Sequence, residues 1–265
     1  MFMNQKFRIG ITPDFYTEAK GKFESVLEEQ LSGASGVESA PMPPQPGKVA
    51  TPDALNQFDA IFSLALKITP ESLQGVDRLA VVARWGVGYD MIDTQTCTDN
   101  DVLLSITRDA VRRPVAEGIM TLLLALTKHV LTKDRLVRSG RWDAKTSYPG
   151  IGLRGRTLGT VGVGNIGGEL ARLLRPFDLR RILAYDPYVS SAQAAEIGVE
   201  LVDLDTLMAE SDFVSINCPL TKDTFHLIGE QQLQRMQPAA LARIHPAPRR
   251  QSGALAARAS RRPDR

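Results

Sequence analysis

The stretch from Gly162 to Gly167, GVGNIG, constrains the fold of this chain more than any other. A G-x-G-x-x-G motif alone is a weak signal, because glycines are common in turns. Here it follows an apolar segment that is typical of a strand (157–163) and opens a helical one (167–174). The next predicted strand, 181–186, ends on Asp186, nineteen residues after Gly167. This is the context of a dinucleotide-binding βαβ unit.

Each part of the motif has a physical role in such a unit. Gly162 permits a tight turn, Gly164 lets a pyrophosphate approach the backbone, and Gly167 allows the helix to pack closely on the strand. The start of the helix offers unpaired N–H groups to phosphate. Asp186 can accept hydrogen bonds from both ribose hydroxyls and would repel a 2′-phosphate, which favours NAD over NADP. A plain βαβ unit with structural glycines is the alternative.

The rest of the chain predicts two doubly wound parallel α/β domains. Apolar stretches at 6–12, 59–66, 79–84 and 101–106 alternate with helical segments, and so do those at 157–163, 181–186 and 212–218. Strands that are apolar throughout are typical of parallel sheets covered on both faces. A helical pattern over 113–139, with Pro114 near its start and Gly140 at its end, could link the domains. We therefore predict a substrate domain at 1–107, flavodoxin-like, a Rossmann domain at 108–237 that includes this linking helix, and an aberrant tail at 238–265.

Charge and composition exclude several function classes. The formal net charge is +2, but the residues from Pro238 onward carry seven Arg and one acid, so this tail is +6 and the rest of the chain is −4. A mildly acidic body gives no reason to expect a nucleic-acid surface. Cys97 and Cys218 are the only cysteines, which favours a reducing compartment. No apolar run reaches the length of a membrane span or of a signal peptide, so we expect a cytoplasmic protein without membrane or nucleic-acid partners.

Several segments, in order along 6–236, resemble one enzyme family. They are VARWGVGYDMID, RRPVAEGIMTLLLAL, LRGRTLGTVGVGNIGGELARLLRPF, AYDPY and DFVSINCPLTKDTFHLI. They are similar to the D-isomer-specific 2-hydroxyacid dehydrogenases, and to the phosphoglycerate dehydrogenase-like branch in particular. The resemblance implies hydride transfer between NAD and a small 2-hydroxy acid, in a homodimer that forms through the nucleotide domain.

The resemblance also assigns site residues. The loop of Trp85, Gly86, Val87 and Gly88 would present backbone N–H groups to the substrate carboxylate, although a plain turn at the end of a strand is the alternative. The segment 115–117 would lie near the nicotinamide, and 217–219 at the carboxyl end of a strand beside the cofactor. Cys218 is more typical of a packed small residue than of a nucleophile. The predicted cofactor-binding residues are Val115, Gly162, Gly164, Asn165, Ile166, Gly167, Asp186, Pro187, Asn217, Cys218, Pro219 and Thr224.

The family's chemistry also needs an acid/base His, a Glu paired with it, and an Arg that binds the carboxylate. The Arg is expected in an N-T-A-R-G-like turn, where this sequence has LARIHPAPRR. His129, His226 and His245 match no proton-transfer position, and Arg243, Arg249 and Arg250 lie outside the expected turn. We assign no catalytic residue and no metal site, and we expect activity to be impaired or lost.

The Ala- and Arg-rich tail suggests an interrupted gene. We expect the chain to be truncated or frame-shifted after about Pro238, which sequencing of the coding DNA would test. A natural disordered basic tail and a nucleic-acid-binding arm are the alternatives. Truncation would leave the strand at 212–218 as an exposed edge. For the whole chain, the alternatives to a dehydrogenase are a non-catalytic NAD-binding module and a non-functional gene product.

Overall fold

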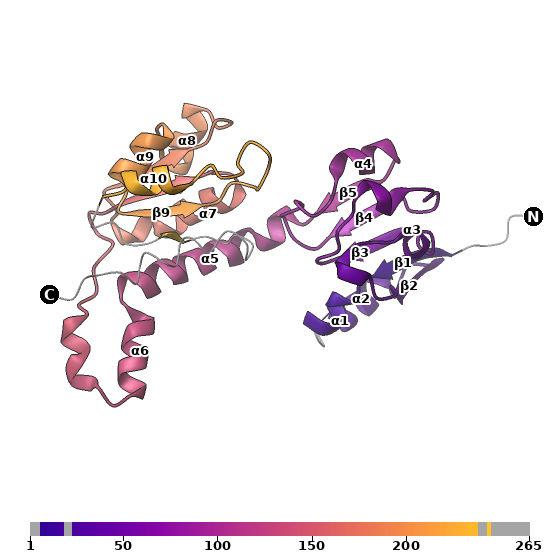
Figure 1. Ribbon diagram of the computed structural model, residues 1–265, viewed down its shortest axis with the longest axis horizontal. Coiled ribbons are helices and arrows are strands. Elements are labelled where there is room, and N and C mark those ends of the chain that lie inside the picture. The colour runs from indigo at the N-terminus through magenta and orange to yellow at the C-terminus, as the bar shows by residue number, and fades with distance from the viewer. Residues whose placement is uncertain (1–5, 19–22, 238–242, 245–265) are drawn as a thin grey trace, which may run out of the picture. The chain divides into compact units, whose positions relative to one another are not determined.

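A computed structural model describes residues 6–18, 23–237 and 243–244, and the chain divides into two compact units, Met1–Val111 and Arg112–Arg265. Within the described residues, each unit contains one five-stranded sheet in which all neighbouring strands are parallel (Figure 1). This confirms the predicted fold class of two parallel α/β sheets.

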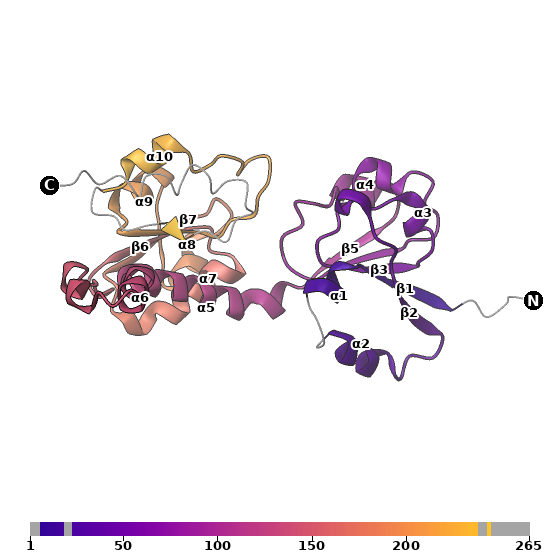
Figure 2. The ribbon, with the colours of Figure 1, turned by 60° about the horizontal axis from the view of Figure 1, so that its bottom comes forward.

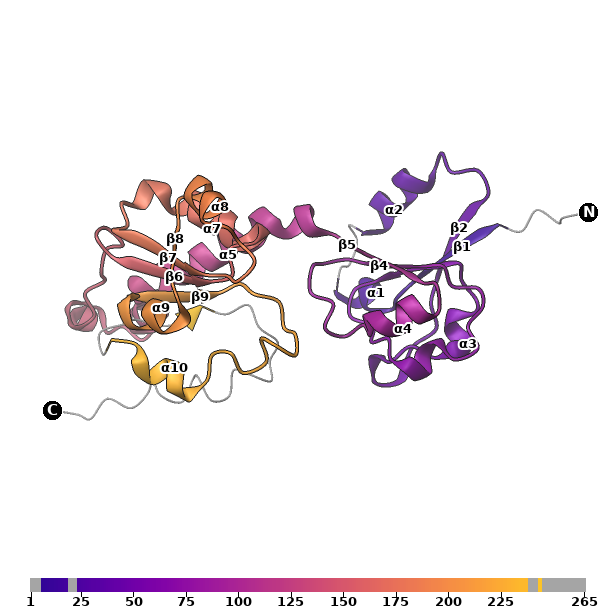
Figure 3. The ribbon, with the colours of Figure 1, turned by 90° about the horizontal axis from the view of Figure 1, so that it is seen from above.

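The sheet of the first unit has the order β2-β1-β3-β4-β5. Helix α2 lies on one face of it, and α3 and α4 lie on the other (Figures 2 and 3). The main core contains Leu55, Ile61, Leu73 and Val82, all of them fully buried. The elements of this unit are β1 (Phe7–Ile11), α1 (Asp14–Glu18), α2 (Phe23–Leu31), β2 (Val37–Pro41), η1 (Pro46–Lys48), α3 (Pro52–Leu55), β3 (Ala60–Ser63), η2 (Pro70–Leu73), β4 (Val81–Arg84), α4 (Thr94–Asp99) and β5 (Leu103–Ile106).

The sheet of the second unit has the order β10-β9-β6-β7-β8, which is the 3-2-1-4-5 order of a Rossmann fold. Helices α5, α7 and α8 lie on one face, and α9 and α10 on the other (Figure 3). The elements are α5 (Arg108–Thr127), α6 (Val130–Arg138), η3 (Trp142–Ser147), β6 (Thr157–Val161), α7 (Asn165–Leu174), η4 (Arg175–Phe177), β7 (Arg181–Tyr185), α8 (Ser191–Ile197), β8 (Glu200–Leu201), α9 (Leu204–Glu210), β9 (Phe213–Ile216), α10 (Glu230–Arg235) and β10 (Arg243–Ile244).

The central strand β6 shows why this unit folds as it does. All five of its residues are buried, as expected for a strand covered on both faces. Leu158 packs into the core under α5 and α7, while Val161 packs into the core under α9. The strand ends at Gly162, whose φ of 91° turns the chain out of the extended conformation, and the glycine turn leads directly into α7.

The prediction of a single helix over 113–139 is wrong. The chain forms α5 and α6, which are bent by 61° at their junction. His129 lies between them with φ of 53°, in the left-handed region, which no continuous helix can contain. Helix α5 also begins at Arg108, so Pro114 lies inside it and not at its first turn. Among the described residues no single helix is long and apolar enough to cross a membrane, and α5 and α6 meet that test only as a bent pair.

Several short elements escaped the sequence analysis. Strand β2 lies in a region with no strand prediction, and the two-residue strand β8 was also missed. The prediction that the strand at 212–218 is an exposed edge is wrong, because β10 pairs with β9 on the side away from β6. The units divide after Val111, close to the predicted boundary after 107. Apart from 243–244, the predicted tail at 238–265 lies outside the described residues.

Candidate functional site

The glycine turn joins β6 to α7 and lies against the end of β9. Gly162 has φ of 91°, and its N–H donates to the carbonyl of Tyr185 at the end of β7, 2.8 Å away. A Cβ at this position would lie 2.9 Å from the backbone nitrogen of Cys218. Both the left-handed conformation and this close approach require glycine. The turn therefore lies between β6 and β9, where the strand order changes direction and ligands of open α/β sheets bind.

The two other glycines of the motif differ in the space around them. Gly164 is the N-cap of α7, and a Cβ there would meet no atom within 4 Å. Space is therefore open in front of the helix start, where Asn165 and Ile166 are the first two residues. A Cβ on Gly167, in contrast, would lie 2.2 Å from the carbonyl oxygen of Gly162. This arrangement suits a phosphate, since unpaired N–H groups of a ten-residue helix face open space.

Asp186 is held beside the same turn. One carboxylate oxygen accepts from the backbone N–H of Val163 at 2.9 Å, and the other accepts from that of Tyr188 at 3.0 Å. A carboxylate has about four acceptor positions, so two hydrogen bonds leave capacity for ribose hydroxyls. Pro187 is exposed next to it. The predicted ribose acid and the predicted phosphate turn thus share one location in the second unit.

The segment after β9 contributes differently from what its sequence suggested. The side chain of Asn217 donates to the hydroxyl of Thr160 at 2.9 Å, so it is turned toward β6. Burial raises the pKa of the Cys218 thiol, and the nearby Asp186 carboxylate adds to this effect, so the thiol stays protonated. Thr224 donates to the carbonyl of Pro219 at 2.5 Å and thereby closes the loop on itself.

Thr160 was missed by the sequence analysis although it contacts the turn directly. Its hydroxyl donates to the carbonyl of Gly162 at 2.8 Å and accepts from Asn217. Its side chain is 1% exposed. The available signal was a hydroxyl in a strand expected to be buried, because a buried hydroxyl needs a partner, but Thr157 in the same strand gives the same signal.

Val115 lies on α5, where it packs with Ile166 of α7 around the same core. An ion pair also holds these two helices together, because Arg113 donates to Glu169 of α7 at 3.1 Å. The Arg113 guanidinium and, to a smaller extent, that of Arg172 lower the pKa of the Glu169 carboxyl. The start of the second unit is therefore fixed to the helix that begins at the glycine turn.

The predicted substrate loop lies in the first unit, after β4. The ring of Trp85 packs against those of Phe15 and Phe62, with centroids 5.1 Å and 5.7 Å away. Gly86 has φ of 140°, and its N–H donates to the hydroxyl of Thr107 at 2.7 Å. This N–H is thus already occupied, contrary to the expectation that the whole loop offers its N–H groups to a carboxylate. Among the described residues, the N–H groups of Val87 and Gly88 have no acceptor.

Arg84, the last residue of β4, lies directly beneath this loop. Its guanidinium donates to the carbonyl of Trp85, and a Cβ on Gly86 would lie 2.9 Å from its central carbon. Burial lowers the pKa of Arg84, and the Asp90 and Asp14 carboxylates offset part of that effect. The guanidinium is the end of a flexible side chain and could move aside, so it is the φ of 140° that favours glycine at position 86.

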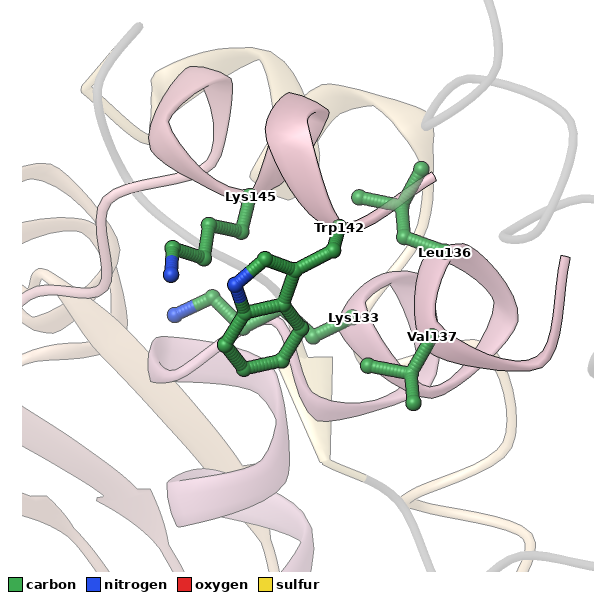
Figure 4. A pocket seen from close by; sticks show the side chains of 5 residues that line it. All are labelled: Lys133, Leu136, Val137, Trp142 and Lys145. Carbon is green, nitrogen blue, oxygen red and sulfur yellow. The ribbon is translucent and has the colours of Figure 1, made fainter. Parts of the chain in front are cut away.

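Two shallow hollows occur elsewhere on the described surface. One, of about 170 Å³, lies on α6 and η3, where the side chains of Lys133 and Lys145 flank the ring of Trp142 (Figure 4). The Lys145 ammonium lies 3.9 Å from the centre of that ring. The other, of about 200 Å³, lies in the first unit next to Thr12, Asp14 and Gln45. Neither contains a residue of the glycine turn or of the loop at 85–88.

The histidines do not form an acid/base site in the described part of the chain. His129 contacts the ring of Tyr148, and His226 contacts that of Phe225, with centroids 6.2 Å and 4.1 Å apart. Neither histidine has a carboxylate partner among the described residues. His245, Arg249, Arg250 and the side chain of Arg243 lie outside the described residues.

Comparison with known proteins agrees with this geometry. Residues 120–242 match the family "D-isomer specific 2-hydroxyacid dehydrogenase, NAD binding domain". A glyoxylate reductase of Thermococcus litoralis is 35% identical over 75% of this chain and 62% of its own length. A D-3-phosphoglycerate dehydrogenase of Archaeoglobus fulgidus is 37% identical over 66% of this chain and 33% of its own length. The chain thus spans less than two thirds of the length of either relative.

A solved structure has the same fold. It is the D-lactate dehydrogenase of Aquifex aeolicus complexed with NAD and lactic acid, which aligns with a TM-score of 0.73 at 23% identity. The alignment covers 86% of this chain and 66% of that structure. At this identity the structure shows agreement in fold alone. The match of residues 120–242 and the two relatives assign the chain, through its NAD-binding domain, to the D-isomer-specific 2-hydroxyacid dehydrogenase family.

Proposed function

We propose that the chain is built for hydride transfer between NAD and a small 2-hydroxy acid. The observation that carries this proposal is the position of Asp186, whose carboxylate accepts from the N–H of Val163 inside the glycine turn. A phosphate site and a ribose acceptor then occupy one place at the carboxyl end of a parallel sheet. In this proposal residues 108–237 are the NAD domain and 1–107 are the substrate domain.

The proposed roles in the NAD domain follow from the local geometry. The helix start after Gly164 would hold the pyrophosphate, and Asp186 with Pro187 would hold the adenosine ribose. Val115, Cys218 and Thr224 would line the remaining cofactor surface, and Asn217 would act through Thr160. The nicotinamide supplies the hydride acceptor when bound, and the protein's part is to bind and orient it.

For the substrate, the proposal relies on the loop after β4. Val87 and Gly88 have N–H groups without an acceptor among the described residues, so they would bind a carboxylate, with Arg84 below them adding positive charge. Trp85 and Gly86 would shape the loop, since the N–H of Gly86 is held by Thr107. Named activities of the relatives suggest a test panel of glyoxylate, hydroxypyruvate and 3-phosphohydroxypyruvate.

We also propose that turnover by these 265 residues is slow. His129 and His226 lack carboxylate partners in the described structure, and general acid–base catalysis is typically worth about 10²–10⁴ in rate. A non-catalytic NAD-binding module is the second candidate, and its support is that the cofactor turn is complete within the described residues. A non-functional gene product is the third.

Two measurements on the full chain separate these candidates. Calorimetric titration should give tighter binding for NAD than for NADP, and Asp186→Ser should reduce that preference because the charge that repels a 2′-phosphate is gone. Oxidation of NADH with the three keto acids then tests turnover. Binding without oxidation supports the module, oxidation supports the enzyme, and failure to bind either cofactor contradicts both.

A homodimer in the cytoplasm is the remaining part of the proposal. Leu131, Val137 and Trp142 on α6 and η3 are 70%, 54% and 59% exposed, and Val137 and Trp142 line one hollow, so this apolar surface is the proposed contact. Sedimentation of the chain and of its Leu131→Asp variant would test this, and a wild-type monomer would contradict it.

A further inference from the structure

Thr160 and Asn217 form a hydrogen-bonded chain that runs from β9 to the glycine turn. The hydroxyl of Ser215 donates to the amide oxygen of Asn217 at 3.1 Å, and the amide nitrogen of Asn217 donates to the hydroxyl of Thr160 at 2.9 Å. Thr160 in turn donates to the carbonyl oxygen of Gly162 at 2.8 Å. Both hydroxyls belong to residues that are 1% exposed, so water is poorly placed to replace these bonds.

The carbonyl that accepts from Thr160 belongs to the peptide group that joins Gly162 to Val163. The oxygen of Gly162 and the N–H of Val163 lie on one rigid peptide plane. That N–H donates to the carboxylate of Asp186 at 2.9 Å. The same peptide is therefore held at both ends, by Thr160 on one side and by Asp186 on the other.

This peptide is also one that could rotate. Its rotation would change ψ of Gly162 together with φ of Val163, and glycine tolerates a wider range of backbone angles than other residues. A rotated peptide would turn the N–H of Val163 away from Asp186. The oxygen of Gly162 also lies close to Gly167, so a change in its direction would disturb the start of α7.

We propose that Thr160 is a positioning residue for NAD, acting through the Gly162–Val163 peptide to fix the pyrophosphate turn and the ribose acid Asp186. Asn217 and Ser215 act behind it and orient its hydroxyl. The inference rests on the proposed NAD site, and it assigns Asn217 an indirect role in place of the direct cofactor contact that its sequence position suggested.

The test compares Thr160→Val, Thr160→Ser and Thr157→Val in the full chain. Thr160→Val keeps the shape but leaves the Gly162 carbonyl and the Asn217 amide without a partner. We expect it to raise the Kd for NAD about 3- to 10-fold, the range that corresponds to one net hydrogen bond. Thr160→Ser restores the hydroxyl and should restore the Kd.

Thr157→Val is the matched control for simple loss of stability. Thr157 is fully buried at the other end of β6, and its hydroxyl accepts from Arg180 at 3.0 Å, away from the turn. This variant should lower the melting temperature of the apo protein and leave the Kd for NAD unchanged. If Thr157→Val and Thr160→Val weaken NAD binding equally, the effect is general destabilisation and the inference fails.

A gentler change keeps the test decisive if Thr160→Val does not fold. Ser215→Ala removes only the bond that orients Asn217, and it should weaken NAD binding in the same direction by a smaller factor. Unchanged affinity in Thr160→Val, or in Ser215→Ala where the first variant is unfolded, overturns the positioning role while the proposed function stands. A wild-type chain that does not bind NAD overturns both.

Discussion

Gly167 and Gly168 are neighbours in α7, yet they leave different room for a side chain. A Cβ on Gly167 would lie 2.2 Å from the carbonyl oxygen of Gly162, whereas one on Gly168 would lie 3.4 Å from that of Val163. We predict that Gly167→Ala lowers the free energy of unfolding by about 1–3 kcal/mol, which is typical of overpacking. It should also weaken NAD binding. Urea denaturation and calorimetric titration of NAD measure the two effects.

Gly168→Ala is the matched control, because it adds the same methyl group one residue further along the helix. Alanine is favoured over glycine inside a helix by about 1 kcal/mol. The control should therefore keep its affinity for NAD and unfold at a slightly higher urea concentration. A loss of stability in both variants would show that the contact between Gly167 and Gly162 is not the reason for the glycine.

At the scale of single residues, the sequence predicts the glycine turn because the spacing itself carries the geometry. The sequence did not single out Thr160, because a threonine in a buried strand is also typical of β-branched packing. Its partner Asn217 is 57 residues away and meets it only when β6 and β9 pair. For Gly86, the sequence suggested a free N–H, but the acceptor Thr107 is 21 residues further along the chain. Contacts of this range depend on the completed sheet.

At the scale of elements, each sheet has an aspartate that joins the starts of two paired strands, β1 with β3 in the first unit and β6 with β9 in the second. Asp59, just before β3, accepts from the backbone N–H of Arg8 at 2.7 Å and from the guanidinium of Arg78 at 3.1 Å and 2.8 Å. Asp212, just before β9, accepts from the backbone N–H of Thr157 and from Arg156, both at 2.8 Å. Each carboxylate thus ties the start of its own strand to the start of the strand that pairs with it, β1 in the first sheet and β6 in the second.

This tie predicts a dependence of stability on pH. The hydrogen bonds from Arg78 lower the pKa of the Asp59 carboxyl in the folded protein, and the backbone N–H of Arg8 adds to this effect. A lowered pKa stabilises the fold above the ordinary pKa of aspartate and loses that contribution as the pH falls through the folded value. Asp59→Asn should therefore be less stable than wild type at pH 7, with a difference that shrinks below about pH 4. Urea midpoints across this pH range measure it.

Arg78→Gln provides the independent check on this interpretation. It removes the largest cause of the lowered pKa, so it should reproduce most of the loss seen in Asp59→Asn at pH 7. Because the two side chains act as one pair, the double variant should lose less than the sum of the single losses. A stability difference that does not change with pH would mean that the charge of Asp59 contributes nothing.

The junction of α5 and α6 shows where element prediction from sequence reaches its limit. The hydrophobic pattern is helical on both sides of His129, and no Gly or Pro marks a break between Val115 and Ser139 except Gly118. The break is fixed from outside the helix, where the N–H of Ile151 donates to the carbonyl of Thr127 at 2.9 Å. A residue that returns from later in the chain therefore ends α5, and local pattern cannot reveal it.

At the scale of the molecule, each unit has its own hydrophobic core, and units of this kind are expected to unfold separately. We predict two calorimetric transitions, of which only the one belonging to the second unit moves when NAD is added. At a concentration of 100 times its Kd, NAD adds about 2.7 kcal/mol to the free energy of unfolding. This corresponds to a rise in melting temperature of about 5–10 °C for a unit of this size.

The Trp142→Phe variant leaves Trp85, packed against Phe15, as the sole tryptophan, so its fluorescence follows the first unit alone. That fluorescence transition should stay where it is, and a shift equal to the calorimetric one would mean that the units unfold as one.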